Sequence, residues 1–174
     1  MIKQFVDSQY CLNKCRLCCK FSQQESVWSP ALLDEEIAES QKNNIPPAVI
    51  NKHKKLVLEP FPKHKDSSLP GHMDMIFVCP FLDTGSNKCK IYSFRPLECK
   101  IYPFLINKRD DKVFLSVDPG CPFIKERLST LEFKEYVQNL TAFILDPAQT
   151  AVLKRNPQLF QVYDDALDLV EIKL

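Results

Sequence analysis

The sequence is poor in glycine and has no strong excess of either charge. Glycine occurs only 3 times in 174 residues, whereas proline occurs 13 times. So little glycine disfavours a many-stranded sandwich with tight turns, and favours helices joined by stiff connections. The formal net charge of +1 gives no general electrostatic attraction to nucleic acid. We therefore expect no nucleic-acid partner.

Long apolar runs are also missing. No segment approaches the roughly 20 apolar residues that a membrane-spanning helix needs, and the first residues lack the apolar region of a secretory signal. We therefore expect no membrane partner and a cytoplasmic, reducing setting. No serine–histidine–carboxylate set, phosphate-binding loop or paired-carboxylate signature stands out, so hydrolase and kinase chemistry have no support.

Cysteine is the residue that the sequence has in excess. The eight cysteines are Cys11, Cys15, Cys18, Cys19, Cys79, Cys89, Cys99 and Cys121. Thiolates suit zinc, copper(I) or iron–sulfur chemistry, and in a reducing compartment they are better explained as ligands than as disulfides. We hypothesise that the first four cysteines and the last four meet around metal in the folded chain.

The spacing of the first four cysteines has geometric consequences. On a helix, Cys11, Cys15 and Cys18 would share one face, and Cys19 would point about 100° away. In an extended chain, adjacent side chains point to opposite faces. The Cys18–Cys19 pair therefore indicates a second ligand set, a bridging sulfur or one unligated thiol.

The same spacing, C-x3-C-x2-C, occurs in radical S-adenosylmethionine enzymes, where three cysteines hold an open iron–sulfur cluster. Two features disfavour that interpretation. Leu17 stands before the third cysteine where an aromatic residue is expected, and glycine-rich cofactor-binding segments are absent. A lone short motif carries little weight by itself.

Three elements are predicted before the second group of cysteines. Ser29-Pro30 is typical of a helix start, with serine as N-cap and proline at the first position, and this helix is expected to end near Asn43-Asn44. Apolar spacing predicts a second short helix from Pro47 to about Leu58. Residues 59–72 are expected to be loop because of their proline, glycine and serine content.

The second group of cysteines lies among short predicted strands. Met75–Val78 is expected to be a buried strand that leads into Cys79, and the turn at 83–87 predicts a hairpin that brings Cys79 close to Cys89. One helical turn is predicted over Ser93–Cys99. Two further strands are expected at 101–106 and 113–117, followed by a chain break that presents Cys121.

The last part of the chain carries helical patterns and no cysteine. Ser129-Thr-Leu-Glu132 is a capping box, and the helix that it opens is expected to reach Asp146-Pro147. One or two further helices are predicted over 148–172. We expect a single α+β domain over 1–174, in which a small cysteine-rich metal-binding core of about 11–125 has short strands. Helices flank that core, and a helical C-terminal segment covers about 129–172.

The cysteine segments together resemble a known family. The matching elements are the cysteine block at 11–19, Cys79–Leu82, Cys89–Tyr92, Arg95-Pro96, Cys99 and Tyr102–Phe104. They resemble the YkgJ-like cysteine-cluster family, the CxxCxxCC zinc- or iron-chelating domain, over about residues 11–125. The first gap in the block is three residues here, where the family name has two. The resemblance implies that all eight cysteines are metal-ligand candidates.

The expected cofactor is a [4Fe–4S] cluster or a zinc ion, and three functions follow. The first is an iron–sulfur protein with a redox role or one that supports a modification reaction. The second is a zinc-stabilised module that binds a partner without catalysis. The third is an S-adenosylmethionine-dependent modification enzyme, such as a protein lysine methylase, because the flagellin lysine methylase carries a similar cysteine block. The sequence leaves open whether the protein is an enzyme.

Further expectations concern the surroundings of the metal. Thiolate-bound zinc or a four-iron cluster is a net anion, and Arg95 is expected to offset that charge through fixed hydrogen bonds. The adjacent Cys18-Cys19 pair and the total of eight cysteines favour more than one metal centre, or a cluster plus an ion. The expected partner is an unidentified protein or redox partner.

Overall fold

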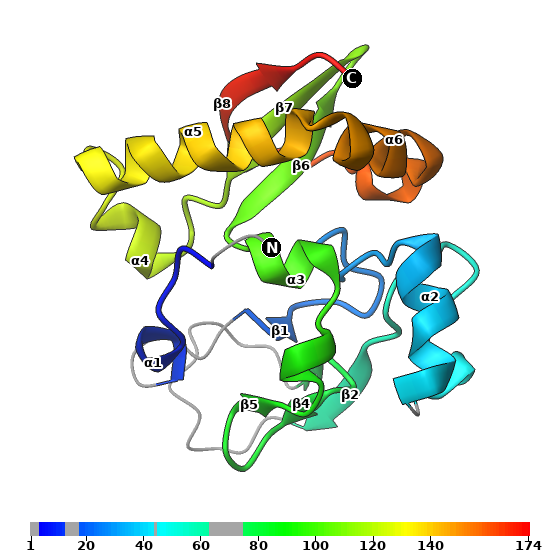
Figure 1. Cartoon of the computed structure of the whole chain (residues 1–174). Helices are drawn as coiled ribbons and strands as arrows, with labels where there is room; N and C mark the ends of the chain where they lie inside the picture. The colour runs from blue at the N-terminus through cyan, green and yellow to red at the C-terminus, as the bar shows by residue number, and fades with distance from the viewer. Residues whose placement is uncertain (1–3, 13–17, 44, 63–74) are drawn as a thin grey trace.

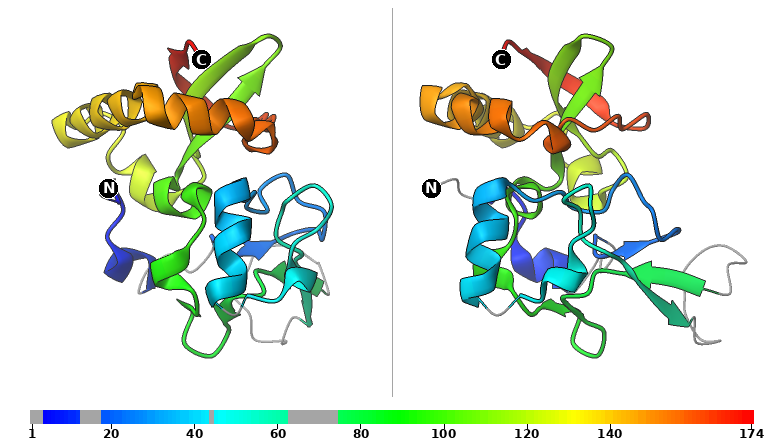
Figure 2. Two further views of the ribbon diagram at one scale, coloured as in Figure 1. Left: turned by 45° about the vertical axis from the view of Figure 1, so that its right-hand side comes forward. Right: turned by 90° about the vertical axis from the view of Figure 1, so that its right-hand side faces the viewer.

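The computed structural model describes residues 4–12, 18–43, 45–62 and 75–174. Figure 1 shows two ends of the molecule. One end holds the sheet β6–β7–β8 with helices α5 and α6, and the other holds the short strands β1–β5 with helices α1 and α2. Helix α3 lies between the two ends, and the turned views in Figure 2 show the same division. This mixture of helices and antiparallel sheets confirms the α+β fold class.

The end that carries most cysteines contains small antiparallel sheets. After α1 (Ser8–Tyr10), strands β1 (Lys20–Phe21), β2 (Glu59–Pro62) and β3 (Met75–Val78) form a sheet in the order β1-β3-β2. Strands β4 (Leu82–Asp83) and β5 (Lys88–Cys89) form a hairpin. The predicted strand before Cys79 and the predicted hairpin are both confirmed.

Three predictions for residues 29–72 need correction. The helix expected from Ser29-Pro30 begins at Asp34, as α2 (Asp34–Ser40), and η2 (Gln41–Asn43) follows it. The helix expected over 47–58 is reduced to η3 (Pro47–Val49), because residues 50 and 56 pair in a β-bridge. The expected loop is wrong at 59–62, which form β2, and its remainder lies outside the described residues.

Long-range hydrogen bonds explain the late start of α2. The Ser29 hydroxyl, expected to cap the helix, donates instead to the carbonyl oxygen of Leu56 at 2.6 Å. The Leu32 N–H donates to the carbonyl oxygen of Lys54 at 2.8 Å. These bonds hold the chain before α2 against residues 54–56, and that pairing overrides the local helix signal.

A turn η4 (Tyr92–Phe94) and helix α3 (Leu97–Ile101) follow β5, where one helical turn was predicted. Strands β6 (Phe104–Arg109) and β7 (Lys112–Val117) confirm the two predicted strands. Strand β8 (Leu167–Ile172) completes the sheet in the order β6-β7-β8. The helix prediction is therefore wrong over 167–172, because this segment pairs with β7.

The helices between β7 and β8 are α4 (Pro122–Lys125), α5 (Leu131–Leu145) and α6 (Pro147–Arg155), and the short turn η5 (Pro157–Leu159) comes after them. Helix α5 confirms the helix predicted after residue 129, although its N-cap is Thr130. The Thr130 hydroxyl accepts a hydrogen bond from the Phe133 N–H at 3.2 Å. Among the described residues, no helix combines the length and the apolar character that crossing a bilayer requires.

The largest apolar core lies between the sheet β6–β8 and helices α4, α5 and α6. Phe104, Leu115, Leu140 and Leu153 are at most 2% exposed in it. Phe5 from the N-terminal segment packs edge to face on Phe104, with ring centroids 5.7 Å apart. A separate core under β1–β3 contains Leu56, Leu58, Val78 and Cys79.

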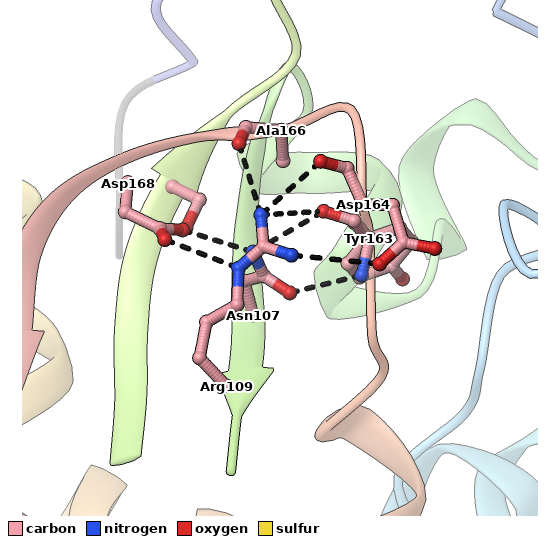
Figure 3. A network of polar contacts seen from close by, with 7 residues as sticks. Asn107, Arg109, Tyr163, Asp164, Ala166 and Asp168 are labelled. Carbon is pink, nitrogen blue, oxygen red and sulfur yellow. Dashed lines mark hydrogen bonds and ion pairs between the residues drawn. The ribbon is translucent and has the colours of Figure 1, made fainter.

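A polar network fixes the segment before β8 to the sheet (Figure 3). The side chain of Asn107, fully buried, donates to Asp168 Oδ1 at 2.9 Å and accepts from the Tyr163 N–H at 2.9 Å. Arg109 donates to the carbonyl oxygens of Tyr163 at 3.0 Å and Ala166 at 3.2 Å, and its Nε lies 3.2 Å from Asp168 Oδ2. These bonds anchor the last strand without any cysteine.

Candidate metal centre

Four thiols from separate parts of the chain gather beside α3. We call Cys18, Cys79, Cys89 and Cys99 the four-thiol group. Cys79 follows β3, Cys89 ends β5 and Cys99 lies on α3. Electrostatic interactions connect the members: the charges of Cys79, Cys89 and Cys18 all act on Cys99, and those of Cys89 and Cys18 act on Cys79. Cys18 of the first group and three cysteines of the second group are thus near enough to influence one another electrostatically.

Backbone pairing explains how these cysteines meet. The Cys79 N–H donates to the Cys19 carbonyl oxygen at 3.0 Å, where β1 pairs with β3. The Leu82 N–H donates to the Cys79 carbonyl oxygen at 2.9 Å, and Leu82 pairs with Cys89 across the hairpin. The block at 18–19 and the hairpin are therefore joined directly through Cys79.

The environment of the four-thiol group favours neutral thiols when no cation is bound. Burial raises the pKa of Cys79 to about 11 and raises the pKa of Cys99 well above its ordinary value. A hydrogen bond with Cys19, and then burial, raise the pKa of Cys18, although that residue as a whole is exposed. Burial also raises the pKa of Cys89. Because metal ligation requires thiolates, a bound cation would have to supply the charge that stabilises them.

Arg95 supplies positive charge next to this group. Its charge acts to lower the pKa values of Cys18 and Cys89, against the larger effects that raise them. The guanidinium group is held in place because it lies 3.8 Å from the centroid of the Tyr92 ring and its Nη2 donates to Gln4 Oε1 at 3.0 Å. A fixed cation of this kind can offset the negative charge of a thiolate-bound metal.

Cys11 and Cys121 lie at the other core. Cys121 is the N-cap of α4 and is 6% exposed, and Cys11 packs partly buried against the same apolar cluster. Tyr102 interacts electrostatically with a cysteine from each place. Burial, then the neighbouring Asp118, and more weakly Cys18 and Cys121 raise the pKa of its hydroxyl group. The described cysteines thus occupy two neighbouring places.

Asp118 organises the loop that presents Cys121. Its Oδ2 accepts the Tyr102 hydroxyl hydrogen at 2.6 Å, and its Oδ1 accepts the Gly120 N–H at 2.7 Å. The Cys121 N–H donates to the Asp118 carbonyl oxygen at 3.3 Å. Tyr102 directly follows α3, so this bond fixes the Cys121 loop relative to the helix that carries Cys99.

Comparison with known proteins gives this arrangement a context. Residues 10–122 match the family model CxxCxxCC, described as "Putative zinc- or iron-chelating domain". The chain belongs to the CxxCxxCC family. A relative is the uncharacterized protein MJ0661 of Methanocaldococcus jannaschii, which is 45% identical over 40 residues, 23% of this chain and 22% of that protein. The chain thus matches less than a quarter of that relative's length. No solved structure matches the chain.

The donor chemistry of the four-thiol group fits a soft metal, as expected for the CxxCxxCC family. The adjacent carboxylate, Glu98, accepts the Ala31 N–H at 2.7 Å and is not left free for a metal. Cys15 lies outside the described residues. Within the described ranges, no three histidine, cysteine or carboxylate side chains are close enough to hold one ion. The described residues alone therefore form no complete metal centre.

Two carboxylates that position Cys99 were missed by the sequence analysis. Glu36 accepts the Leu97 N–H at 2.7 Å and the Leu33 N–H at 2.9 Å, so it joins the first turn of α3 to the start of α2. Glu98 bonds to Ala31 in the same way, and burial raises its pKa to about 8. No local pattern marks these residues, because their partners on the other segment lie 61 and 67 positions away in the sequence.

Proposed function

We propose that the protein holds metal through cysteine thiolates and carries an iron–sulfur cluster with a redox role or in support of a modification reaction. The proposed ligands are Cys11, Cys15, Cys18, Cys19, Cys79, Cys89, Cys99 and Cys121, with the four-thiol group as the main centre. The proposal is supported by the electrostatic interactions among Cys18, Cys79, Cys89 and Cys99, which come from the 18–19 block, the residue after β3, β5 and α3. Four cysteines are the usual ligand number of a [4Fe–4S] cluster.

The chain's own residues have three tasks in this proposal. The cysteines bind, and Arg95 balances the negative charge of the bound thiolates. Glu36 and Glu98 fix α3, which carries Cys99, to residues 31–36. A four-iron cluster, when bound, would supply one-electron chemistry. Cys11 and Cys121, with Cys15, are proposed as ligands of a second centre.

A zinc-stabilised binding module is the second candidate. Cys79 is 7% exposed, and burial also raises the pKa of Cys99. Structural zinc sites are closed, with four protein ligands and no open position. In this candidate the metal would only hold the loops together, and function would lie in binding a partner.

Anaerobic purification with metal analysis and an absorption spectrum separates the candidates. The iron–sulfur proposal predicts iron, acid-labile sulfide and broad absorbance that gives a brown colour. A colourless protein with stoichiometric zinc would favour the zinc module. Binding of S-adenosylmethionine in calorimetry would instead support a modification enzyme, and a protein without tightly bound metal would overturn both metal candidates.

Substitution of single ligands tests the site. Cys79→Ser and Cys99→Ser should each lower both the metal content and the free energy of unfolding, because metal binding contributes to folding. Leu153→Ala is the matched control: Leu153 is 2% exposed in the core on α6, so its loss should lower stability and leave the metal content unchanged. Full metal content in both cysteine variants would show that neither thiol is a ligand.

A further inference from the structure

Two exposed aromatic side chains lie between Cys89 and Cys99. Tyr92 and Phe94, both in η4, are 47% and 56% exposed. In the described part of the chain, the other large exposed apolar side chains are aliphatic, and they lie at residues 131, 145, 162 and 167. Exposed aromatic residues are enriched where proteins bind partners. The segment between β5 and α3 lies at the cysteine-bearing end, away from β7 and β8 (Figures 1 and 2).

Basic residues flank this aromatic pair in the sequence. Lys88 and Lys90 are exposed, and Arg95 and Lys100 are half-buried. The one carboxylate in residues 88–100 is Glu98, which bonds to the Ala31 N–H. The charges that this segment offers to a partner are therefore positive.

The neighbouring acid, Asp83, is occupied within its own hairpin. Its Oδ1 accepts the N–H groups of Gly85 at 2.9 Å and Ser86 at 3.2 Å. Those bonds and the charge of Lys90 hold the pKa of Asp83 below its ordinary value. Asp83 lies opposite Lys88 across the hairpin and interacts with the charge of Lys90, so it reduces the positive charge of these two lysines without cancelling it.

Tyr92 is held rigidly on this surface. Gln4 Oε1 accepts hydrogen bonds from the Tyr92 hydroxyl at 3.2 Å and from Arg95 Nη2 at 3.0 Å. The Arg95 guanidinium group lies over the Tyr92 ring at 3.8 Å and also donates from Nε to the Tyr92 carbonyl oxygen at 3.1 Å. A side chain that is already ordered loses little conformational entropy on binding, which favours its use as an anchor.

We propose that Tyr92 and Phe94, together with Lys88, Lys90 and Arg95 of the same segment, form a docking surface for a protein partner that presents acidic side chains around an apolar pocket. The opposite charges would steer the partner and fix its orientation. One face of the Tyr92 ring is covered by Arg95, which leaves less aromatic surface for stacking nucleic-acid bases. The inference deepens the proposed function, because the partner would lie over the segment that joins two candidate ligands.

The test uses a displayed library of random peptides, selected on the metal-replete protein. We expect the selected peptides to combine acidic residues with an apolar one. Their affinity should fall at least about tenfold with Phe94→Ala, as for a central anchor, and with Lys88→Glu. The matched controls are Leu131→Ala, at a side chain that is 70% exposed on α5, and Lys134→Glu on the same helix, and both should leave the affinity unchanged.

Other outcomes would overturn the inference. Selected peptides without acidic residues, or equal binding by the Phe94→Ala variant, would show that this surface does not select an acidic partner. Tighter binding of a fluorescent oligouridylate that is lost with Phe94→Ala would indicate a nucleic-acid site. Self-association that is lost with Phe94→Ala would indicate a second copy of the chain. Metal content, measured for every variant, reports separately on the proposed function.

Discussion

The two ends of the molecule are stabilised differently. The end formed by β6, β7, β8 and α5 has strands of 6 residues and a helix of 15, and its side chains form the largest apolar core. At the cysteine-bearing end, β1, β4 and β5 have 2 residues each. Strands this short contribute few ladder hydrogen bonds and are not stable on their own. Although this end has a smaller apolar core of its own, the contrast predicts that bound metal contributes more to its stability than to that of the other end.

Residues 31–36, which we call the strap, connect the two ends. They are hydrogen-bonded to α3 through the carboxylates of Glu36 and Glu98. The same segment bonds to the C-terminal part, because Gln158 donates to the Leu32 carbonyl oxygen at 2.8 Å and Asn156 accepts the Asp34 N–H at 2.8 Å. The helix that carries Cys99 is thereby positioned by both ends.

Metal removal should have the largest effect and should destabilise the cysteine-bearing end much more than the end with β6–β8. Anaerobic chelation is expected to abolish the protection of backbone amides against hydrogen exchange in β1–β5, because apparent binding free energies of structural zinc in small cysteine sites are about 10 kcal/mol or more. Protection in β6–β8 and α5 should largely remain. Hydrogen-exchange mass spectrometry measures both at once. Equal loss of protection at both ends would refute the division.

Leu140→Ala should produce the opposite pattern. Leu140 is 1% exposed in the core under α5, and removing such a side chain costs about 2–5 kcal/mol. The metal content should stay at the wild-type level. Denaturant unfolding and metal analysis of the same sample test this. Metal loss that parallels the loss of stability would show that the two ends fold as one unit.

Asp168→Asn should have a smaller effect, confined to the end with the sheet. Burial acts to raise the pKa of Asp168, but hydrogen bonds from Ser116, Asn107 and Arg109 outweigh it and hold the pKa below its ordinary value. The loss of these bonds should cost about 1–3 kcal/mol at neutral pH. Asp164→Asn, at a side chain that is 88% exposed, should stay within about 0.5 kcal/mol of the wild type.

The pH dependence gives a second readout for Asp168. Because its pKa is lower in the folded state, its contribution is present above the unfolded value of about 3.9 and is lost as the pH falls through the folded value. The Asp168→Asn variant should therefore lose less stability than the wild type below about pH 4. Unfolding curves at several acidic pH values measure this, and parallel curves would exclude a charge effect at Asp168.

Arg95→Lys should have the smallest effect, visible in kinetics and not in stability. Lysine cannot reproduce the stacked, planar contact with Tyr92 while also bonding to Gln4. We expect the metal to stay bound but to pass to a competing chelator a few times faster, or to shift in potential. Arg155→Lys, at a surface ion pair with Glu35, is the control and should match the wild type. Identical release rates in all three proteins would remove Arg95 from the site.

The sequence predicted the elements whose signals are local. The strand before Cys79 and the hairpin that ends at Cys89 follow from short apolar runs and turn residues. The helix expected over 47–58 failed because Ile50 and Leu56, spaced as in a helix, pair with each other in a β-bridge inside that segment. Strand β8 was missed because Val170 pairs with Leu115, far away in the sequence.

The same distinction applies to the candidate site. The cysteines could be identified because their residue type and spacing carry the chemistry. The carboxylates that place Cys99, and the Gln4 side chain that holds Arg95, act over 61 to 91 positions in the sequence. A single sequence contains no signal for such hydrogen bonds, since the residues themselves are ordinary surface types. Their roles follow from the fold alone.

X-ray absorption at the metal edge of the anaerobically purified protein tests the central claim most directly. The proposed thiolate centre predicts a first shell of sulfur alone, at about 2.3 Å for zinc and with additional iron neighbours for a cluster. In the Cys99→Ser variant that shell should lose sulfur. A first shell dominated by nitrogen and oxygen, or a sulfur shell that both Cys79→Ser and Cys99→Ser leave unchanged, would contradict the proposed centre.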